Sequence, residues 1–161
     1  MIGPVHHRRI AVDGIDVFYR EAGPPEAPAV LLPHGYPCSS YAYRNLMAAL
    51  AHRWRLIAPD MPGFGYSATP SPDEFAYTFD AYAAFLQAFV DAVGLSRYVV
   101  WLHDYGSQFG FRLALHRPIG SRASSSRTVT STRTRSAPNT NSSRSCGMTR
   151  ARSRGVASPN T

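Results

Sequence analysis

The spacing of apolar residues over the first part of the chain predicts short strands that alternate with helices. Residues 8–12 and 15–19 are short β-like runs on either side of Asp13-Gly14, a dipeptide that favours the type I′ turn of a β-hairpin. Three later runs are largely apolar, as strands buried on both faces are, and each leads into a loop. These runs are residues 27–33, 55–60 and 98–103.

Three further segments place apolar side chains at helical spacing, namely residues 41–52, 78–94 and 106–116. In the second segment, Thr78 is a favourable N-cap, and Gly94 stands where a helix end takes a left-handed residue. This segment also carries an aromatic stripe that we expect to pack in the core, formed by Phe79, Tyr82, Phe85 and Phe89. Strands that alternate with helices after a hairpin predict an α/β fold with a mainly parallel sheet and helices on both faces.

The composition changes near His116, and this change predicts a globular part, residues 1–116, and a tail, residues 117–161. All ten acidic residues and all the Phe, Trp and Tyr residues belong to the first part, which has eight Arg. The second part has nine Arg, many Ser and Thr, and no acidic residue, Leu or aromatic residue. Such a segment buries too little apolar surface to offset the entropy of ordering, so we expect it to be disordered.

Length and composition narrow the class of protein. A chain of 161 residues suits one domain, and a 44% share of hydrophobic residues excludes wholesale disorder. No apolar run reaches the roughly 18 residues of a membrane span, and no signal peptide is recognisable, so we expect no membrane partner. Cys38 and Cys146 cannot form a disulfide framework, which predicts a cytoplasmic protein. The pair His6-His7 stands apart from other metal-ligating residues, so no metal site is predicted.

Three loops that follow the carboxyl ends of the buried runs carry the candidate chemistry. They are HGYP at residues 34–37, DMPGFGYS at residues 60–67 and HDYGS at residues 103–107. In an open parallel sheet, ligands bind at this edge. In the third loop Asp104 stands on a tight strand-to-helix turn, and Gly106 and Ser107 are small enough for the two backbones to approach. This is the arrangement of a nucleophile elbow, with Asp in the position more often held by Ser.

These three loops, in this order and spacing, resemble those of the α/β-hydrolase superfamily. The resemblance is closer to its aspartate-nucleophile branch, the epoxide hydrolases and haloalkane dehalogenases, and it covers residues 5–116. It implies the N-terminal portion of an α/β-hydrolase fold. It also implies that the family's activity is hydrolysis of an epoxide-like small molecule through an aspartyl ester, with no metal and no organic cofactor.

The resemblance assigns roles to positions of this sequence. Asp104 would attack an electrophilic carbon and form an ester intermediate. The backbone N–H groups of Tyr36 and Tyr105 would form the oxyanion hole for hydrolysis of that ester. The loops would be shaped by His34, Gly35, Pro37 and Gly106.

Departures from the family pattern bear on the substrate. Dehalogenases of this branch usually have Asn at the position of Tyr36 and Trp at the position of Tyr105, so the sequence favours epoxide-like substrates, with a haloalkane or haloacid dehalogenase as the alternative. Leu102 stands where a small residue is usual, which predicts a crowded turn. Ser107 lies past the tightest point of the turn, which disfavours a serine esterase. We expect Cys38 to be a small polar filler rather than a reactive thiol.

Several parts of the family's machinery have no counterpart in this sequence. The family's catalytic histidine and second acid lie far towards the C-terminus, whereas the last histidine here is His116 and the last acid is Asp104. By the same resemblance, we expect the cap domain and the last strands of the sheet to be missing. We therefore expect a truncated hydrolase without a general base, in which Asp104 is alkylated at most once.

The tail has two competing interpretations. A reading frame shifted by one base after His116 can encode a helix end, an apolar strand and an acidic loop like those of the family, so one hypothesis is a single-base deletion. The other is a noncatalytic basic protein whose tail binds nucleic acid or an anionic membrane. Because the tail lacks interleaved aromatics and any recognisable module, no specific nucleic-acid partner is predicted. The sequence leaves the oligomeric state open.

Overall fold

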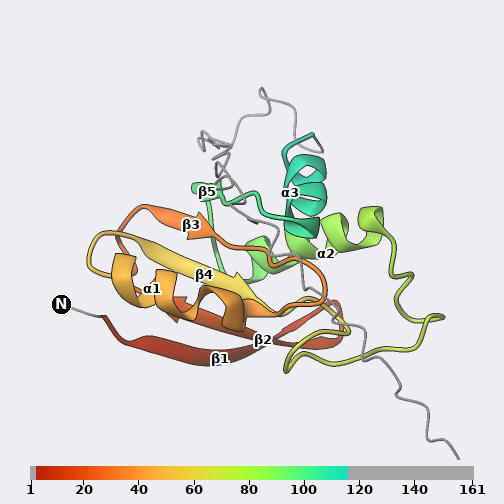
Figure 1. The fold of residues 1–161 in the computed structure, drawn as a ribbon. Helices are drawn as coiled ribbons and strands as arrows, with labels where there is room; N and C mark the ends of the chain where they lie inside the picture. The colour runs from red at the N-terminus through yellow and green to blue at the C-terminus, as the bar shows by residue number, and fades with distance from the viewer. Residues whose placement is uncertain (1–2, 116–161) are drawn as a thin grey trace, which may run out of the picture.

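The structure is a computed structural model that describes residues 3–115, so the predicted tail lies outside the described residues. Its centre is a five-stranded sheet with the order β1-β2-β4-β3-β5 (Figure 1). The strands are β1 Val5–Val12, β2 Ile15–Ala22, β3 Ala29–Leu31, β4 Arg55–Pro59 and β5 Tyr98–Val100. The helices are the short 3₁₀ helix η1 Ser40–Tyr43 and the α-helices α1 Arg44–Leu50, α2 Phe79–Ala92 and α3 Tyr105–Leu115.

The predicted N-terminal hairpin is confirmed, because β1 and β2 pair antiparallel with Val12 opposite Ile15. Asp13 and Gly14 have φ values of 50° and 80°, as the two central residues of a type I′ turn require. Both strands are longer than the apolar pattern indicated. Their outer ends carry polar side chains, which still pair across the strands but give no hydrophobic signal.

The sheet combines parallel and antiparallel strands. β4, β3 and β5 are parallel, as predicted for the three buried runs, whereas β2 pairs antiparallel with β4. The hairpin therefore extends the same sheet, a placement that the apolar pattern does not specify. Strand β3 is short because Pro28 and Pro33, which have no N–H to donate, flank it.

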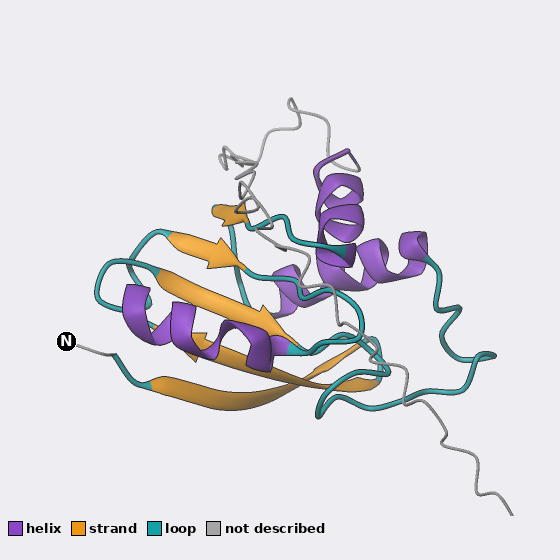
Figure 2. Cartoon of the chain, viewed as in Figure 1, coloured by secondary structure: helices purple, strands orange, loops and turns teal. Residues whose placement is uncertain are grey.

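Different helices bury the two faces of the sheet (Figure 2). Leu31 belongs to the core cluster on the α2 side, whereas the next residue, Leu32, belongs to the cluster that contains Met47 of α1. In β4, Ile57 and Leu56 divide between the two clusters in the same way. Since successive strand residues point to opposite faces, both faces are covered, which confirms the predicted α/β arrangement.

Helix α2 begins and ends as predicted. The Thr78 side chain accepts a hydrogen bond from the Ala81 N–H at 3.1 Å, and Gly94 follows the helix with a φ of 70°. Helix α3 begins at Tyr105, one residue earlier than predicted. None of the helices within residues 3–115 is long and apolar enough to cross a bilayer.

The prediction that the whole aromatic stripe of α2 packs in the core is wrong for one residue, Phe79. Its side chain is 38% exposed, whereas the other three members of the stripe are buried. Phe79 is the first residue of the helix, and its ring contacts Tyr105 and Phe109 of α3 at centroid distances of 5.2 and 5.9 Å. Phe79 therefore lines a cavity instead of packing in the core.

Candidate active site

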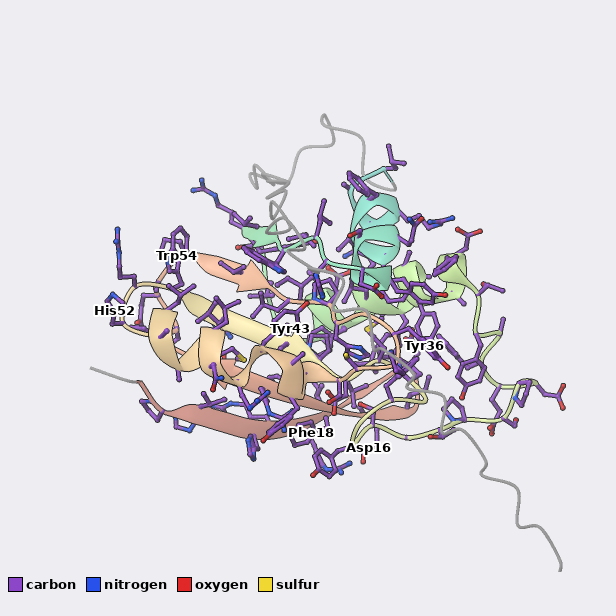
Figure 3. The ribbon with its side chains drawn as sticks, viewed as in Figure 1. Asp16, Phe18, Tyr36, Tyr43, His52 and Trp54 are labelled. Atoms are coloured by element: carbon purple, nitrogen blue, oxygen red, sulfur yellow. The ribbon has the colours of Figure 1, made fainter. Side chains whose placement is uncertain are left out.

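The three predicted loops come together at one end of the sheet. Figure 3 shows Tyr36, in the first loop, at the end of the sheet far from His52 and Trp54. Met61 of the second loop donates its N–H to a ring nitrogen of His34, and the N–H of Tyr36 reaches Asp104 of the third loop. The carboxyl ends of the parallel strands therefore form one site, as such sheets favour.

Asp104 occupies a strained turn between β5 and α3. Its φ is 49°, in the left-handed region that non-glycine residues rarely adopt. The N–H of Ser107 donates to the Asp104 carbonyl at 3.0 Å, which closes the turn. This geometry presents the Asp104 side chain at the mouth of the turn, where it is exposed.

Two backbone N–H groups converge on one oxygen of this side chain. Oδ1 of Asp104 accepts hydrogen bonds from the Tyr105 N–H at 2.7 Å and from the Tyr36 N–H at 3.0 Å. The Tyr105 bond, and after it the Tyr36 bond, lower the pKa of the Asp104 carboxyl below its ordinary value. The carboxylate is thus ionised at neutral pH. Among residues 3–115, no hydrogen bond reaches the other oxygen, Oδ2, and the Asp104 residue is exposed.

Two glycines let the loops approach this closely. A Cβ atom on Gly106 would lie 2.2 Å from the carbonyl oxygen of Pro33. A Cβ atom on Gly35 would lie 2.5 Å from the Cβ and Oδ1 atoms of Asp104. Since both contacts are far shorter than van der Waals distance, no other residue fits at either position without movement of the backbone or the carboxylate.

A third glycine makes room for Leu102. A Cβ atom on Gly110, one turn into α3, would lie 2.5 Å from the Cδ2 atom of Leu102. The leucine therefore occupies space that a side chain on the helix would otherwise fill. The crowding predicted around Leu102 is therefore relieved because Gly110 of α3 has no side chain, and not by the turn itself.

His34 joins the first and second loops. It is buried, its Nε2 accepts the Met61 N–H at 3.1 Å, and its Nδ1 lies 2.9 Å from the carbonyl oxygen of Gly35. Since Nε2 accepts, the proton is on Nδ1, which donates to Gly35. Burial lowers the pKa of His34, so the ring is neutral. The peptide bond between Tyr36 and Pro37 in the same loop is cis.

Asp60 connects the second loop to the start of η1, the helix that follows the first loop. The sequence indicated only part of this role. Asp60 is fully buried, and its Oδ1 accepts the Ser40 N–H at 2.6 Å while its Oδ2 accepts the Tyr66 N–H at 2.8 Å. A Cβ atom on Gly65 would lie 2.0 Å from Oδ2. We expected Asp60 to stabilise its own loop, but the link to Ser40 spans 20 residues and appears only in the fold.

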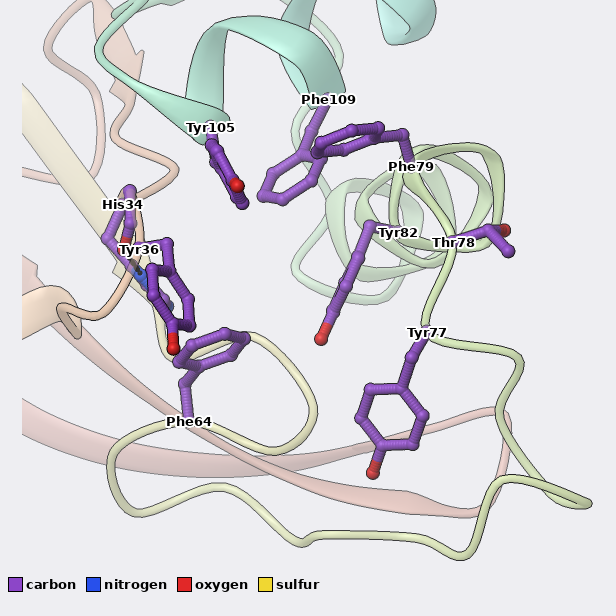
Figure 4. Close-up of a pocket in the computed structure, with 10 residues that line it drawn as sticks. His34, Tyr36, Phe64, Tyr77, Thr78, Phe79, Tyr82, Tyr105 and Phe109 are labelled. Atoms are coloured by element: carbon purple, nitrogen blue, oxygen red, sulfur yellow. Dashed lines mark hydrogen bonds between the residues drawn. The ribbon is translucent and has the colours of Figure 1, made fainter.

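A cavity of about 450 Å³ lies at this end of the sheet (Figure 4). Its lining includes Tyr36 and Tyr105, the residues whose N–H groups hold the carboxylate, and the rest is mostly aromatic. The lining residues are His34, Gly35, Tyr36, Phe64, Tyr77, Thr78, Phe79, Tyr82, Tyr105 and Phe109. Sequence analysis did not assign Phe64, Tyr77 and Phe109 to the site. They lie in the second loop, before α2 and in the middle of α3, and only the fold brings these segments together.

Some other residues that the sequence singled out do not line this cavity, namely Cys38, Ser107, His6 and His7. Cys38 is exposed, and Ser107 sits half-buried in the first turn of α3. His6 and His7 belong to β1, and the described part of the chain holds no group of three or more side chains suited to a metal ion.

Residues 28–138 match a protein family described as the alpha/beta hydrolase fold. The chain belongs to the α/β-hydrolase family. The match runs through all three loops of the site and continues past residue 115, beyond the described residues.

The relatives of this α/β-hydrolase chain include proteins named for different hydrolase activities. An uncharacterized hydrolase of Saccharomyces cerevisiae is 41% identical over 112 residues, which cover 70% of this chain and 38% of that protein. An epoxide hydrolase of Caballeronia sordidicola is 39% identical over 117 residues, 72% of this chain and 35% of that protein. The crystal structure of haloalkane dehalogenase DbeA from Bradyrhizobium elkani is 37% identical with a TM-score of 0.67, covering 71% of this chain and 38% of that one. The chain thus spans less than two fifths of the length of these relatives.

Proposed function

We propose that this chain carries the nucleophile side of the active site of a hydrolase for epoxide-like substrates, with Asp104 as the nucleophile. The observation that supports this proposal is the asymmetric setting of the Asp104 carboxylate. Oδ1 is held by the N–H groups of Tyr36 and Tyr105, whereas Oδ2 has no hydrogen bond among the described residues, and Asp104 is exposed. The lowered pKa keeps the nucleophile ionised.

The first half of the reaction is alkylation of Asp104. Oδ2 attacks a carbon of the epoxide ring, a C–O bond of the ring breaks, and its electron pair moves to the ring oxygen. The product is an ester between Asp104 and the opened substrate, so one difficult step becomes two easier ones.

The second half is hydrolysis of that ester by water. As water adds to the ester carbon, negative charge develops on Oδ1, which already has the two N–H donors of Tyr36 and Tyr105 directed at it. Donors that are in place before the charge develops need no reorganisation, and each contributes about 3 kcal/mol to such steps.

This second half needs a general base, and we propose that residues 3–115 do not supply one. His34 has both ring nitrogens engaged, one with Met61 and one with Gly35. No histidine in the described part of the chain forms a hydrogen bond to Asp104. The chain would then stop at the alkylated enzyme.

A haloalkane substrate is the second candidate, because DbeA, the solved relative described above, is a haloalkane dehalogenase. The same attack by Oδ2 would then break the carbon–halogen bond and release halide, whereas the oxygen of an opened epoxide stays on the ester. The aromatic cavity suits an apolar chain of either kind, because neither bears a charge that needs a partner.

The test is to incubate the full 161-residue chain with styrene oxide or with 1-iodobutane and follow its intact mass and the modified peptide. We expect one adduct per chain, on Asp104, and no adduct with Asp104→Asn, which keeps the shape but lacks the nucleophile. An adduct with the epoxide alone favours the first candidate, and an adduct with the iodide alone favours the second. Product beyond one equivalent would contradict the missing base, and absence of any Asp104 adduct would refute the proposal.

A further inference from the structure

Arg20, in β2, is a buried cation that the reaction proposed above does not use. The residue is 4% exposed, and a guanidinium keeps its charge wherever it lies in a protein. Among residues 3–115, none of the ion pairs includes Arg20. Because a buried charge is costly unless its surroundings compensate it, the contacts of this side chain indicate what it does.

The guanidinium of Arg20 contacts the start of η1. Its Nη1–H group donates a hydrogen bond to Oγ of Ser40, the first residue of η1. The central carbon of the guanidinium lies 5.4 Å from the ring centre of Tyr41, the next residue, and 5.0 Å from that of Phe18 in β2. One side chain of β2 therefore holds two consecutive residues of η1, and two aromatic faces stabilise its charge.

Ser40 is shared between Arg20 and Asp60. Its N–H donates to Oδ1 of Asp60 at 2.6 Å, while its Oγ accepts the hydrogen bond of Arg20. All three residues are buried, and in such surroundings hydrogen bonds are strong and the loss of one partner is costly. The start of η1 is thus fixed from two sides, by β2 and by the second loop.

The segment that ends at Ser40 carries one of the two N–H donors to the Asp104 carboxylate. It begins at His34, whose ring is bonded to the second loop. Between these two anchors the Tyr36 N–H donates to Oδ1 of Asp104 at 3.0 Å. The other donor, the Tyr105 N–H, belongs to the first residue of α3. A shift of the segment would therefore move one donor and leave the other in place.

We propose that Arg20 is a positioning residue for the candidate active site, which keeps the Tyr36 N–H directed at Asp104 through its hydrogen bond to Ser40. Its value for ester hydrolysis rests on the function proposed above, because the Tyr36 N–H is one of the two donors to the oxyanion. The Tyr105 bond, and after it the Tyr36 bond, lower the pKa of Asp104, so loss of the Tyr36 bond raises this pKa.

The test uses two variants of the full 161-residue chain that remove either partner of one hydrogen bond. Arg20→Met keeps an unbranched stem between the rings but removes the donor. Ser40→Ala removes the acceptor and keeps the N–H that reaches Asp60. In both variants we expect NMR-detected hydrogen exchange of the Tyr36 N–H to become about tenfold faster, the ratio that corresponds to one net hydrogen bond. Exchange of the Tyr105 N–H should change less than about twofold, because α3 stays in place.

The pKa of Asp104 is the second readout, followed through the NMR resonance of its carboxyl carbon. It should rise in both variants, since Oδ1 keeps the Tyr105 donor but loses the Tyr36 donor. An Asp104 pKa that does not rise would show that the Tyr36 bond persists, and the inference would then be wrong.

The matched control is Arg55→Met, at an arginine outside the candidate active site and the cavity lining. Arg55 begins β4, at the end of the sheet opposite the site, and its guanidinium pairs with Glu21 at 2.8 Å. Since this variant also removes a bonded guanidinium from a strand, it shows what general destabilisation does. Exchange of both N–H groups should stay within about twofold of the parent chain.

The pattern of exchange separates the possible outcomes. Equal acceleration of the Tyr36 and Tyr105 N–H groups, or the same acceleration in the control, would assign Arg20 a general structural role and overturn the inference. Unchanged exchange at Tyr36 would also overturn it and leave the proposed function standing. If Arg20→Met does not fold, Ser40→Ala decides by the same criteria. A parent chain that forms no Asp104 adduct with styrene oxide or 1-iodobutane would overturn the proposed function, whereas exchange still decides the role of Arg20.

Discussion

The two sides of the candidate active site depend on different forces. Around Asp104 the contacts are directional hydrogen bonds, mostly from backbone N–H groups, and glycines allow the loops to touch. Across the cavity, the contacts are between aromatic rings, such as Tyr82 and Phe109 with centroids 4.9 Å apart. The position of Asp104, the proposed nucleophile, therefore depends on close approach of backbone segments, whereas the aromatic wall depends on burial of apolar area.

The largest effect on stability is expected in the aromatic wall, for Phe109→Ala. Phe109 is 3% exposed and packs on Tyr82 and Phe79, so its removal leaves a hole that the surrounding rings fill only in part. We expect the free energy of unfolding to fall by about 3–5 kcal/mol, measured by urea denaturation. Phe111→Ala, in the same helix but 50% exposed, is the matched control and should lose about 1 kcal/mol or less. Equal losses would show that the wall is not packed as described.

An intermediate effect is expected on the polar side, for Gly106→Ala. The new Cβ would lie 2.2 Å from the Pro33 carbonyl oxygen, and a backbone atom cannot turn away as a side chain can. We expect a loss of about 1–3 kcal/mol, together with loss of the Asp104 adduct because the two N–H donors separate. In the control, Gly110→Ala, the close contact is the tip of the Leu102 side chain, so adduct formation should persist. Adduct formation that survives Gly106→Ala would contradict the role given to this approach.

The smallest effect concerns pH and the histidine that joins the loops. Burial lowers the pKa of His34 below its ordinary value of 6.5, so below that pH the unfolded chain binds a proton that the folded chain does not. The stability contribution is therefore complete above the unfolded pKa and is lost as the pH falls towards the lowered one. We expect the free energy of unfolding to fall by up to about 1.4 kcal/mol per pH unit in this window. His34→Gln should remove this slope, whereas His52→Gln, at an exposed residue, should keep it.

Much of the local structure could be predicted because its causes lie within a few residues. The Asp13-Gly14 turn needs two positive φ values, and the caps at Thr78 and Gly94 follow from hydrogen-bonding and left-handed preferences. The family was also predictable, since the HGYP, DMPGFGYS and HDYGS loops are contiguous in sequence. The lengths of β1 and β2 were underestimated, because polar residues can pair in an edge hairpin without an apolar pattern.

The sequence by itself determined the hairpin turn, the two caps of α2, the alternation of strands and helices, and the three loops that carry Asp104 and its neighbours. Only the tertiary structure decided that Phe79 lines a cavity, that Gly110 makes room for Leu102, and that Phe64 and Phe109 face one space. It also decided which phenols are free, because Tyr82 finds its carbonyl partner 20 residues away and Tyr105 finds none among the described residues. Short-range preferences act along the chain, whereas the setting of a side chain depends on which distant elements pack beside it.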